Sequence, residues 1–275
     1  MTISRGDASR QLDSRGHRAK RALGQNFVVD PNTVRRIARL AGVGAGDAVV
    51  EVGAGLGSLT LALAETGADV TAVEIDENLL PLLHANVAHL SNVRVVHGDA
   101  TRLDWDTLLA GRDDWHLVAN LPYNVATPLV ADVLDDVPAV RHLFVMVQKE
   151  VGERLAASPG DDAYGAVSVK VAFHAEASVA GTVPPTVFLP RPNVDSALVS
   201  IVRRSEPVAA DIDRALLFSL VRAGFAKRRK MLRGALAGVA TEGQMESSGI
   251  APTARAEELS VHDWVRLART IAATR

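Results

Sequence analysis

Residues 49–57 have the sequence VVEVGAGLG, in which an apolar run leads directly into three glycines at alternate positions. A short apolar run that ends at glycine is typical of a buried strand in a parallel sheet. Glycine suits the turn that follows, because the backbone turns tightly there and a ligand can approach it without meeting a Cβ atom. The stretch therefore predicts a strand, a ligand-binding turn and the start of a helix.

The spacing of these glycines narrows the class of ligand. Ser58 stands where the dinucleotide-binding fingerprint has its last glycine. We therefore expect the turn to pack against an uncharged nucleoside rather than to hold a pyrophosphate. The same departure, together with the lack of a catalytic acid–base pair, argues against an NAD-linked dehydrogenase. For the glycine motif alone, a structural turn is the alternative.

Strands and helices are predicted in alternation on both sides of residues 49–57. The helix before them starts at Pro31, with Asp30 as its N-cap, and ends at Gly42. Such alternation is typical of an α/β fold with a doubly wound, mostly parallel sheet of the Rossmann-like type. The predicted strands span residues 48–52, 70–75, 93–97, 116–119, 143–147 and 194–202, and the helices between them span residues 58–66, 76–88 and 127–134.

Hydropathy and charge divide the chain into three parts. Residues 1–20 are basic and have very few apolar side chains, so we expect a disordered tail. The α/β pattern fills residues 21–204. Residues 211–239 and 253–272 then have helical patterns with no further strand, so residues 205–275 are predicted to form a small all-helical domain.

The composition is that of a globular protein, with 275 residues, 48% hydrophobic and 23% charged, and a formal net charge of −2. No apolar run reaches the roughly 18 residues of a membrane span, and residues 1–21 lack the apolar core of a secretory signal. The chain has no cysteine, and its eight histidines show no metal-ligand spacing. We expect a cytoplasmic protein with no membrane segment, no disulfide and no bound metal.

Two carboxylates stand at the ends of the next two predicted strands. Glu74 can accept hydrogen bonds from both hydroxyls of a ribose, and Asp99 can accept from an adenine amino group. Either one alone is equally well explained as a solvated charge. Together with the glycine turn they predict an adenosine-bearing cofactor held without a phosphate clamp, which S-adenosylmethionine fits. The predicted cofactor site also includes Gly53, Gly55, Ile75 and Ala100.

The tetrapeptide Asn120-Leu121-Pro122-Tyr123 follows the fourth strand and contains no strong base. That suits methyl transfer to an adenine amino group, in which the enzyme mainly positions the acceptor. The Asn120 side-chain oxygen and the Leu121 carbonyl are predicted to accept from the amino hydrogens, while Pro122 stiffens the turn and Tyr123 stacks on the base. The alternative is a plain turn.

Two further segments belong to this prediction. Asn26 precedes the first helix of the sheet domain and is expected to close over the methionine end of the cofactor. Phe188, in the proline-rich segment FLPRP, is predicted to form the second face of a base-stacking clamp. Local packing of the Phe188 ring is the alternative.

A dense basic run lies in the predicted helical domain. Its cations are predicted to line one face of a helix and to contact RNA phosphates, so that RNA is recognised by its shape. A solvated surface helix is the alternative. The residues are Arg222, Lys227, Arg228, Arg229, Lys230 and Arg233.

From about Arg21 onward the chain resembles the small-subunit ribosomal-RNA adenine N6,N6-dimethyltransferases (the KsgA type). The resemblance implies dimethylation of two adjacent adenines near the 3′ end of 16S rRNA in the immature 30S subunit, linked to ribosome biogenesis. Its motifs are residues 24–27, 51–57, 74–76, 98–100, 120–123, 148–155 (QKEVGERL), 164–165, 188–196 (FLPRPNVDS), 225–236 (FAKRRKMLRGAL) and 255–260 (RAEELS).

By position, the resemblance assigns roles to single residues. The cofactor contacts it implies are Asn26, Val28, Gly53, Glu74, Asp99 and Asn120. The base contacts it implies are Asn120, Leu121, Tyr123 and Phe188. The chain departs from the common pattern at Ala54, which replaces a proline, at Val28, which replaces a leucine, and at Gly234, which replaces an asparagine. These departures are expected to affect local contacts only.

Other substrates and another class of protein stay open. Large-subunit rRNA methyltransferases that confer antibiotic resistance share the chemistry, but residues 225–236 argue against them. A DNA adenine methyltransferase is disfavoured by the form of the tetrapeptide at residues 120–123. The protein could instead act mainly as an assembly factor that binds the ribosome. Asn120→Ala would distinguish this role from methyl transfer. We expect a monomer.

Overall fold

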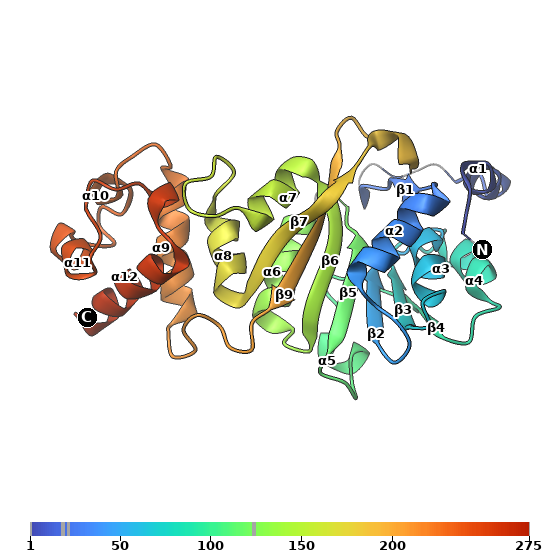
Figure 1. The fold of residues 1–275 in the computed structure, drawn as a ribbon, viewed down its shortest axis with the longest axis horizontal. Helices are drawn as coiled ribbons and strands as arrows, with labels where there is room; N and C mark the ends of the chain where they lie inside the picture. The colour runs from blue at the N-terminus through green and yellow to red at the C-terminus, as the bar shows by residue number, and fades with distance from the viewer. Residues whose placement is uncertain (1, 18–19, 21–22, 123–124, 275) are drawn as a thin grey trace. The chain divides into compact units, whose positions relative to one another are not determined.

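The valine-rich strand β2 lies inside a seven-stranded sheet of order β4-β3-β2-β5-β6-β9-β7 (Figure 1). The strands from β4 to β6 are parallel to their neighbours, and β9 is antiparallel to β6. The predicted Rossmann-like sheet is thereby confirmed. In chain order the strands are β2 (Ala48–Val52), β3 (Asp69–Glu74), β4 (Val93–His97), β5 (Trp115–Asn120), β6 (Val140–Gln148), β7 (Ala175–Val183) and β9 (Ser196–Arg203).

The computed structural model describes residues 2–17, 20, 23–122 and 125–274. They divide into two compact units. The first comprises Met1–Gly152 with Ser178–Arg203 and contains the sheet, and the second comprises Glu153–Ala177 with Arg204–Arg275.

The connections between the strands create one switch point in the sheet. From β2 the chain moves outward to β3 and β4, and it then returns to β5 on the other side of β2. In open parallel sheets a crevice forms at such a point, beyond the carboxyl ends of the two strands. Here that point lies between the ends of β2 and β5, which carry the glycine turn and Asn120.

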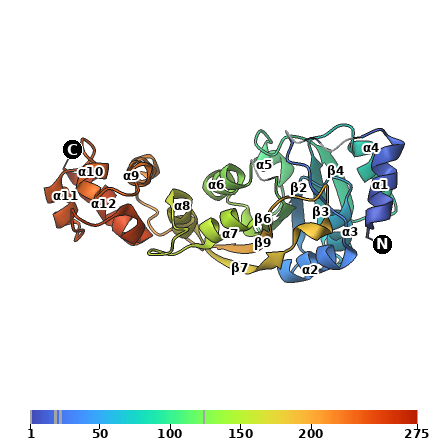
Figure 2. The same ribbon diagram turned by 90° about the horizontal axis from the view of Figure 1, so that it is seen from above.

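Helices α2 (Pro31–Ala41), α3 (Ser58–Ala64) and α4 (Leu80–Val87) cover one face of the sheet. Val70 and Ala72 point to the same face of β3, since they are two residues apart. Val70 packs in a cluster with α2 and α3, and Ala72 packs in a cluster with α4. Seen from above, α5 (Trp105–Leu108) and α6 (Ala126–Asp136) lie on the other side of the sheet from α2 and α3 (Figure 2).

A small second sheet precedes α2. Strand β1 (Phe27–Val28) pairs antiparallel with β8 (Phe188–Leu189), which follows the short 3-10 helix η2 (Pro185–Val187). The β1–β8 pair joins the segment before α2 to the segment before β9, a pairing that the sequence patterns did not predict.

Helix α7 (Lys149–Ala156) follows β6 directly.

Helix α1 (Arg5–Ser14) occupies the region predicted to be a disordered tail, and that prediction was wrong for these residues. Ser4 caps the helix through a reciprocal pair of bonds with Asp7. Ala8 and Leu12 are buried with Ile3 in the cluster that also contains the apolar residues of α4. Two apolar side chains on the helix and Ile3 before its N-cap are buried in this cluster, although they barely change the composition of the segment.

The second unit is built from helices and has its own core. The indole of Trp264 is fully buried there among Phe173, Leu217 and Leu220. Residues 153–177 belong to this unit as well, so it is larger than the predicted residues 205–275. Its elements are α8 (Ala166–His174), α9 (Arg214–Ala226), α10 (Leu232–Ala235), α11 (Glu242–Ser247), η3 (Ala256–Glu258) and α12 (Val261–Ala273).

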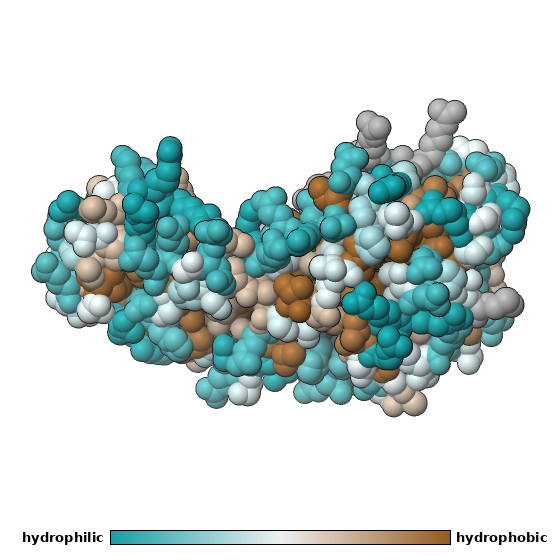
Figure 3. Space-filling view, turned by 45° about the horizontal axis from the view of Figure 1, so that its top comes forward, coloured by the Kyte–Doolittle hydropathy of each residue, from teal (hydrophilic) through white to brown (hydrophobic). Residues whose placement is uncertain are grey.

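Hydrophilic residues predominate on the face shown in the space-filling view, where hydrophobic residues form only small patches (Figure 3). Within the described part of the chain, no helix is both long and apolar enough to cross a membrane. The same residues contain no cluster of three or more His, Cys, Asp or Glu side chains suited to a metal ion.

Candidate active site

The glycine turn after β2 lies against both neighbouring strands. The amides of Gly53 and Ala54 donate to the Val73 carbonyl at 2.9 and 3.1 Å. Gly55 has a φ of 59°, and a Cβ atom there would lie 3.0 Å from the ring of Phe27. Only glycine fits this position, because both the backbone conformation and the space exclude a side chain. Proline, the residue common at position 54 in the resembling family, would lack the amide that Ala54 donates.

Two adjoining cavities open at the switch point and share Leu23, Gly53, Ile75 and Pro122 among their lining residues. Many of the other lining residues come from the ends of the strands on either side of the glycine turn. Every predicted cofactor residue lines one or both cavities: Asn26, Val28, Gly53, Gly55, Glu74, Ile75, Asp99, Ala100 and Asn120.

Glu74 ends β3 and is 4% exposed. Its two carboxylate oxygens accept from the amides of Gly55, at 2.6 Å, and of Asp76, at 2.8 Å. Burial raises the pKa of this carboxyl, and the backbone donors oppose that rise. A carboxylate has about four acceptor positions, so acceptor capacity is left for hydroxyl groups of a ligand.

Asp99 follows β4 and is more exposed than Glu74. One oxygen accepts from the Thr101 amide at 2.9 Å and from the Thr101 hydroxyl at 2.8 Å. These bonds lower the pKa of the Asp99 carboxyl, so it is ionised at neutral pH and acts only as an acceptor. Its other oxygen lies 3.9 Å from the Arg102 guanidinium, which is itself largely exposed.

Asn120 ends β5 next to the glycine turn. A Cβ atom at Gly53 would lie 3.9 Å from the Asn120 carbonyl oxygen. The Asn120 side-chain amide donates from Nδ2 to the Asn26 carbonyl at 3.0 Å. This bond fixes the amide so that Oδ1 is the atom left to accept a hydrogen bond from a ligand.

The rest of the tetrapeptide is only partly described. The Leu121 amide donates to the Met146 carbonyl at 3.0 Å and extends the β5–β6 ladder by one residue. The Pro122 carbonyl accepts from Val125 and Ala126 and so begins α6. Tyr123 lies outside the described residues, and its stacking role stays a prediction.

Phe188 does not occupy the predicted position. Its ring is fully buried in the cluster formed by β1, α2, α3 and the sheet, with Val28 and Val34 among its members. Pairing of β8 with β1 places Phe188 opposite Val28 and turns the ring inward. The clamp assignment is therefore corrected: Phe188 is a core residue, as the local-packing alternative held.

Several cavity residues were not predicted from the sequence. Glu51 lines the first cavity, is 2% exposed, and accepts from the Thr60 hydroxyl at 2.5 Å. Burial raises the pKa of Glu51 to about 8; the nearby Glu74 charge adds to this, and the Thr60 bond opposes it. Ser58 also lines this cavity with a buried hydroxyl that has no hydrogen-bond partner among the described residues. A carboxylate inside an otherwise apolar strand is a signal from which Glu51 could have been found.

The basic run lies at the end of a helix rather than along one. Helix α9 ends at Ala226, and residues 227–230 form a turn in which the Lys230 amide donates to the Lys227 carbonyl at 2.7 Å. Cations stabilise a helix C-terminus, because the backbone carbonyls there carry partial negative charge. The predicted helical face is therefore wrong.

The cations of the run also differ from one another. Arg228 pairs with Glu257 at 2.7 Å and donates to the Asp162 carbonyl at 2.6 Å. The side chains of Lys227, Arg229 and Lys230 are exposed and form no hydrogen bond or ion pair with other described residues. Arg222 and Arg233 are exposed as well. Arg228 thus has a structural role, and the free cations remain candidates for RNA contact.

The cavity residues fit S-adenosylmethionine by their own chemistry. Glu74 and Asp99 offer acceptors for hydroxyl and amino groups. No Lys, Arg or His is found among the described residues that line either cavity, so a phosphate group has no counter-ion there. A cationic, phosphate-free cofactor matches cavities that are lined by the carboxyl groups of Glu74 and Asp99 and by no cation. The sheet topology and this cavity define the class of protein: a Rossmann-like methyltransferase that uses S-adenosyl-L-methionine.

Comparison with known proteins narrows the class to a family. The family model described as ribosomal RNA adenine dimethylase matches residues 16–273, and the chain belongs to that family. It is therefore an rRNA adenine dimethyltransferase. The ribosomal RNA small subunit methyltransferase A of Streptomyces avermitilis is 48% identical over 263 residues, covering 92% of this chain and 88% of the relative.

Solved structures show the same fold at lower identity. A dimethyladenosine transferase from Plasmodium falciparum superposes with a TM-score of 0.71 at 22% identity, over 86% of this chain and 94% of that one. The 23S rRNA methyltransferase ErmE gives a TM-score of 0.67 at 24% identity, over 90% of this chain and 99% of its own. One of these neighbours is named for 23S rRNA, so the shared fold alone does not identify the RNA on which this chain acts.

Proposed function

We propose that this protein dimethylates N6 of two adjacent adenines near the 3′ end of 16S ribosomal RNA. Membership of the dimethylase family supports the reaction, and the name of the Streptomyces avermitilis relative supports the small subunit. The cofactor contacts in this proposal are the residues at the ends of β1 to β5, and Asn120 with Leu121 holds the target amino group.

The orientation of the Asn120 amide is the observation that carries the proposal. Its Nδ2 donates to the Asn26 carbonyl at 3.0 Å, which leaves Oδ1 as an acceptor at the switch point of the sheet. An adenine amino group is a poor nucleophile because its lone pair is delocalised into the ring. Acceptors at Asn120 Oδ1 and the Leu121 carbonyl bind both amino hydrogens, turn the lone pair out of conjugation and stabilise positive charge that develops on N6.

The same residues act in the second transfer. When bound, S-adenosylmethionine supplies the activated methyl group. After one methylation a single N6 hydrogen is left, so one of the two acceptor bonds is lost. We expect the monomethylated base to stay a substrate in a changed position, because the remaining bond and base stacking still hold it.

The test is methyl transfer from labelled S-adenosylmethionine to under-methylated 30S subunits, with the modified nucleotides mapped by mass spectrometry. The expected product is dimethyladenosine at two adjacent positions near the 16S 3′ end. Label in large-subunit RNA would replace the proposed substrate with that of the resistance-type enzymes. Monomethyladenosine as the sole product under excess cofactor would refute dimethylation.

Asn120→Ala tests the role of the amide. We expect the transfer rate to fall by about a hundredfold or more, as for other groups that stabilise developing charge. Asn92→Ala is the matched control, because that side-chain amide donates to the backbone carbonyls of Ala64 and Ala68 and lines neither cavity. If the inactive variant still restored full small-subunit assembly in cells, binding rather than methylation would be the main function.

The proposal includes a particle as substrate and a monomer as enzyme, acting in the cytoplasm. In a folded subunit, the RNA around the target adenines has a defined arrangement of phosphates and 2′-hydroxyls. Exposed cations such as Lys227, Arg229 and Lys230 can contact those phosphates. Comparing naked 16S rRNA with immature 30S particles tests the substrate. Sedimentation of the enzyme alone tests the monomer.

A further inference from the structure

Asp76 is a buried carboxylate for which the cofactor site offers no direct use. It follows β3 two residues after Glu74 and is 3% exposed. Its backbone amide donates to the Glu74 carboxylate at 2.8 Å. Asp76 itself is not among the described residues that line the two cavities. Its side chain therefore acts on other protein groups.

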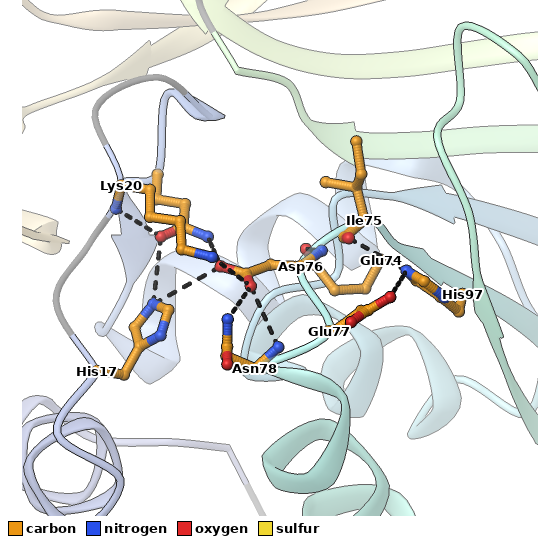
Figure 4. Close-up of polar contacts among 9 residues, drawn as sticks. His17, Lys20, Glu74, Ile75, Asp76, Glu77, Asn78 and His97 are labelled. Atoms are coloured by element: carbon orange, nitrogen blue, oxygen red, sulfur yellow. Dashed lines mark hydrogen bonds and ion pairs between the residues drawn. The ribbon is translucent and has the colours of Figure 1, made fainter.

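Those groups come from the segment before β1 (Figure 4). Oδ1 of Asp76 accepts from the Lys20 ammonium at 2.8 Å, and Oδ2 accepts from the Gln25 amide at 2.8 Å. Asn78 donates to Oδ1 as well, and His17 Nε2 lies 3.9 Å from Oδ2. Burial alone would raise the pKa of Asp76, but the bonds from Lys20, Gln25 and Asn78 outweigh it and hold the pKa at about 2.

The Gln25 amide has only one workable orientation. Its Oε1 accepts from the Lys20 backbone amide at 2.7 Å, so its Nε2 must face Asp76. Residues 23–28, here called the cavity wall, lie next to this bond and all line the first cavity. At the other side the wall is held by the bond from Asn120 to the Asn26 carbonyl. The wall is thus fixed between Asp76 and Asn120.

Helix α1 does not depend on Asp76 for its attachment. Arg5 donates to the carbonyls of Thr186 and Phe188 at 2.6 and 2.9 Å. Gln11 exchanges amide hydrogen bonds with Asn86 at 2.9 Å. Ala8 and Leu12 are buried. Helix α1 is therefore attached without Asp76. The bonds of Asp76 instead hold the cavity wall in position.

We infer that Asp76 is a positioning residue for cofactor binding, holding the cavity wall in place through Gln25 and Lys20. The inference rests on the proposed assignment of this cavity to the cofactor. Asp76→Asn leaves one acceptor oxygen and sets an amide donor against the Gln25 donor. Losing a charge-assisted bond of this kind weakens S-adenosylhomocysteine binding by about tenfold or more.

The experiment is calorimetric titration of the full-length protein with S-adenosylhomocysteine, together with steady-state kinetics. Asp76→Asn should raise Kd and the KM for S-adenosylmethionine while kcat at saturating cofactor stays within about twofold. Lys20→Met should show a smaller increase in the same direction. Glu77→Gln is the matched control, since it removes a neighbouring carboxylate whose side chain is 80% exposed.

A swap of acid and amide distinguishes positioning from general stability. The double variant Asp76→Asn with Gln25→Glu restores a donor–acceptor pair in reverse, and its Kd should return to within about threefold of wild type. A Kd that follows only the loss in unfolding temperature, with no recovery in the swap, would overturn the inference.

Glu74→Ala separates this inference from the cofactor assignment. If Glu74→Ala abolishes binding while Asp76→Asn leaves Kd unchanged, the positioning role alone is wrong. If Glu74→Ala has no effect on binding, the cavity assignment fails, and the positioning inference fails with it.

Discussion

Strand β2 carries a single charged residue, Glu51, and its environment sets an unusual protonation state. The carboxyl is 2% exposed, and burial raises its pKa to about 8 from an ordinary value of 4.5. Between these two values the folded protein keeps a proton that the unfolded chain releases. The contribution of Glu51 to stability is therefore greatest below pH 4.5 and declines as the pH rises toward 8.

Glu51→Gln removes this titration while keeping the shape and an acceptor for Thr60. Relative to wild type, the variant should gain stability as the pH rises from 5 to 8, by up to about 1.4 kcal/mol per pH unit. Urea unfolding of the ligand-free protein across that range measures the difference. Glu77→Gln, which removes a carboxylate whose side chain is 80% exposed, serves as the control. A difference for Glu51→Gln that does not change with pH would mean that the buried carboxyl ionises near its ordinary value.

Single residues also show where sequence reasoning succeeds and fails. Glu74, Asp99 and Asn120 were predictable because each stands at a strand end, and parallel strands bring such ends together. Phe188 was misplaced because its burial depends on pairing of β8 with β1, residues that are far apart in the chain. Asp76 stood out only as part of a motif, since its partners Lys20 and Gln25 come from a segment with no regular pattern.

Elements with strong internal patterns were predictable and the others were not. The strands β2 and β4 agree with the predicted residues 48–52 and 93–97, because each is a short apolar run bounded by polar or glycine residues. Helix α8 was missed, since its place in the helical unit depends on packing against α9 and α12 rather than on its own periodicity. Strand β7 was also missed, as it is largely exposed and lacks the apolar signal of a buried strand.

Close packing between α9 and α12 gives a prediction at this scale. A Cβ atom at Gly224 would lie 2.5 Å from Trp264 Cη2 and 3.4 Å from the Ala256 Cβ atom. The indole is fully buried, so it can move aside only by displacing other core residues. Gly224→Ala should therefore lower the free energy of unfolding by about 1–3 kcal/mol, the usual effect of overpacking a core.

Gly243→Ala is the matched control for that substitution. Gly243 lies in helix α11, and a Cβ atom there would meet nothing within 4 Å. This variant should gain about 0.5–1 kcal/mol, because alanine favours a helix over glycine. Urea denaturation of both variants makes the comparison. Equal effects at the two positions would show that the α9–α12 interface is not tightly packed.

Over the whole molecule, the small net charge gives no sign of the cations that are clustered at residues 227–230. The formal net charge is −2, which by itself argues against binding a polyanion. Several surface cations pair with a carboxylate, as Arg35, Arg112 and Arg269 do. Lys227, Arg229 and Lys230 have none among the described residues, so they are free to bind phosphates without first losing a partner.

The salt dependence of RNA binding tests this distribution. Replacing Lys227, Arg229 and Lys230 with glutamine should weaken binding to a 16S 3′-end fragment. It should also reduce the slope of log K against log salt by about 0.7 for each RNA phosphate that the variant no longer neutralises. The control replaces Arg35, Arg112 and Arg269 with glutamine, which changes the net charge equally but removes only cations that are already paired. If both triple variants reduced the slope alike, the total charge would govern binding; a reduction confined to the first identifies the turn at residues 227–230 as a site of RNA binding.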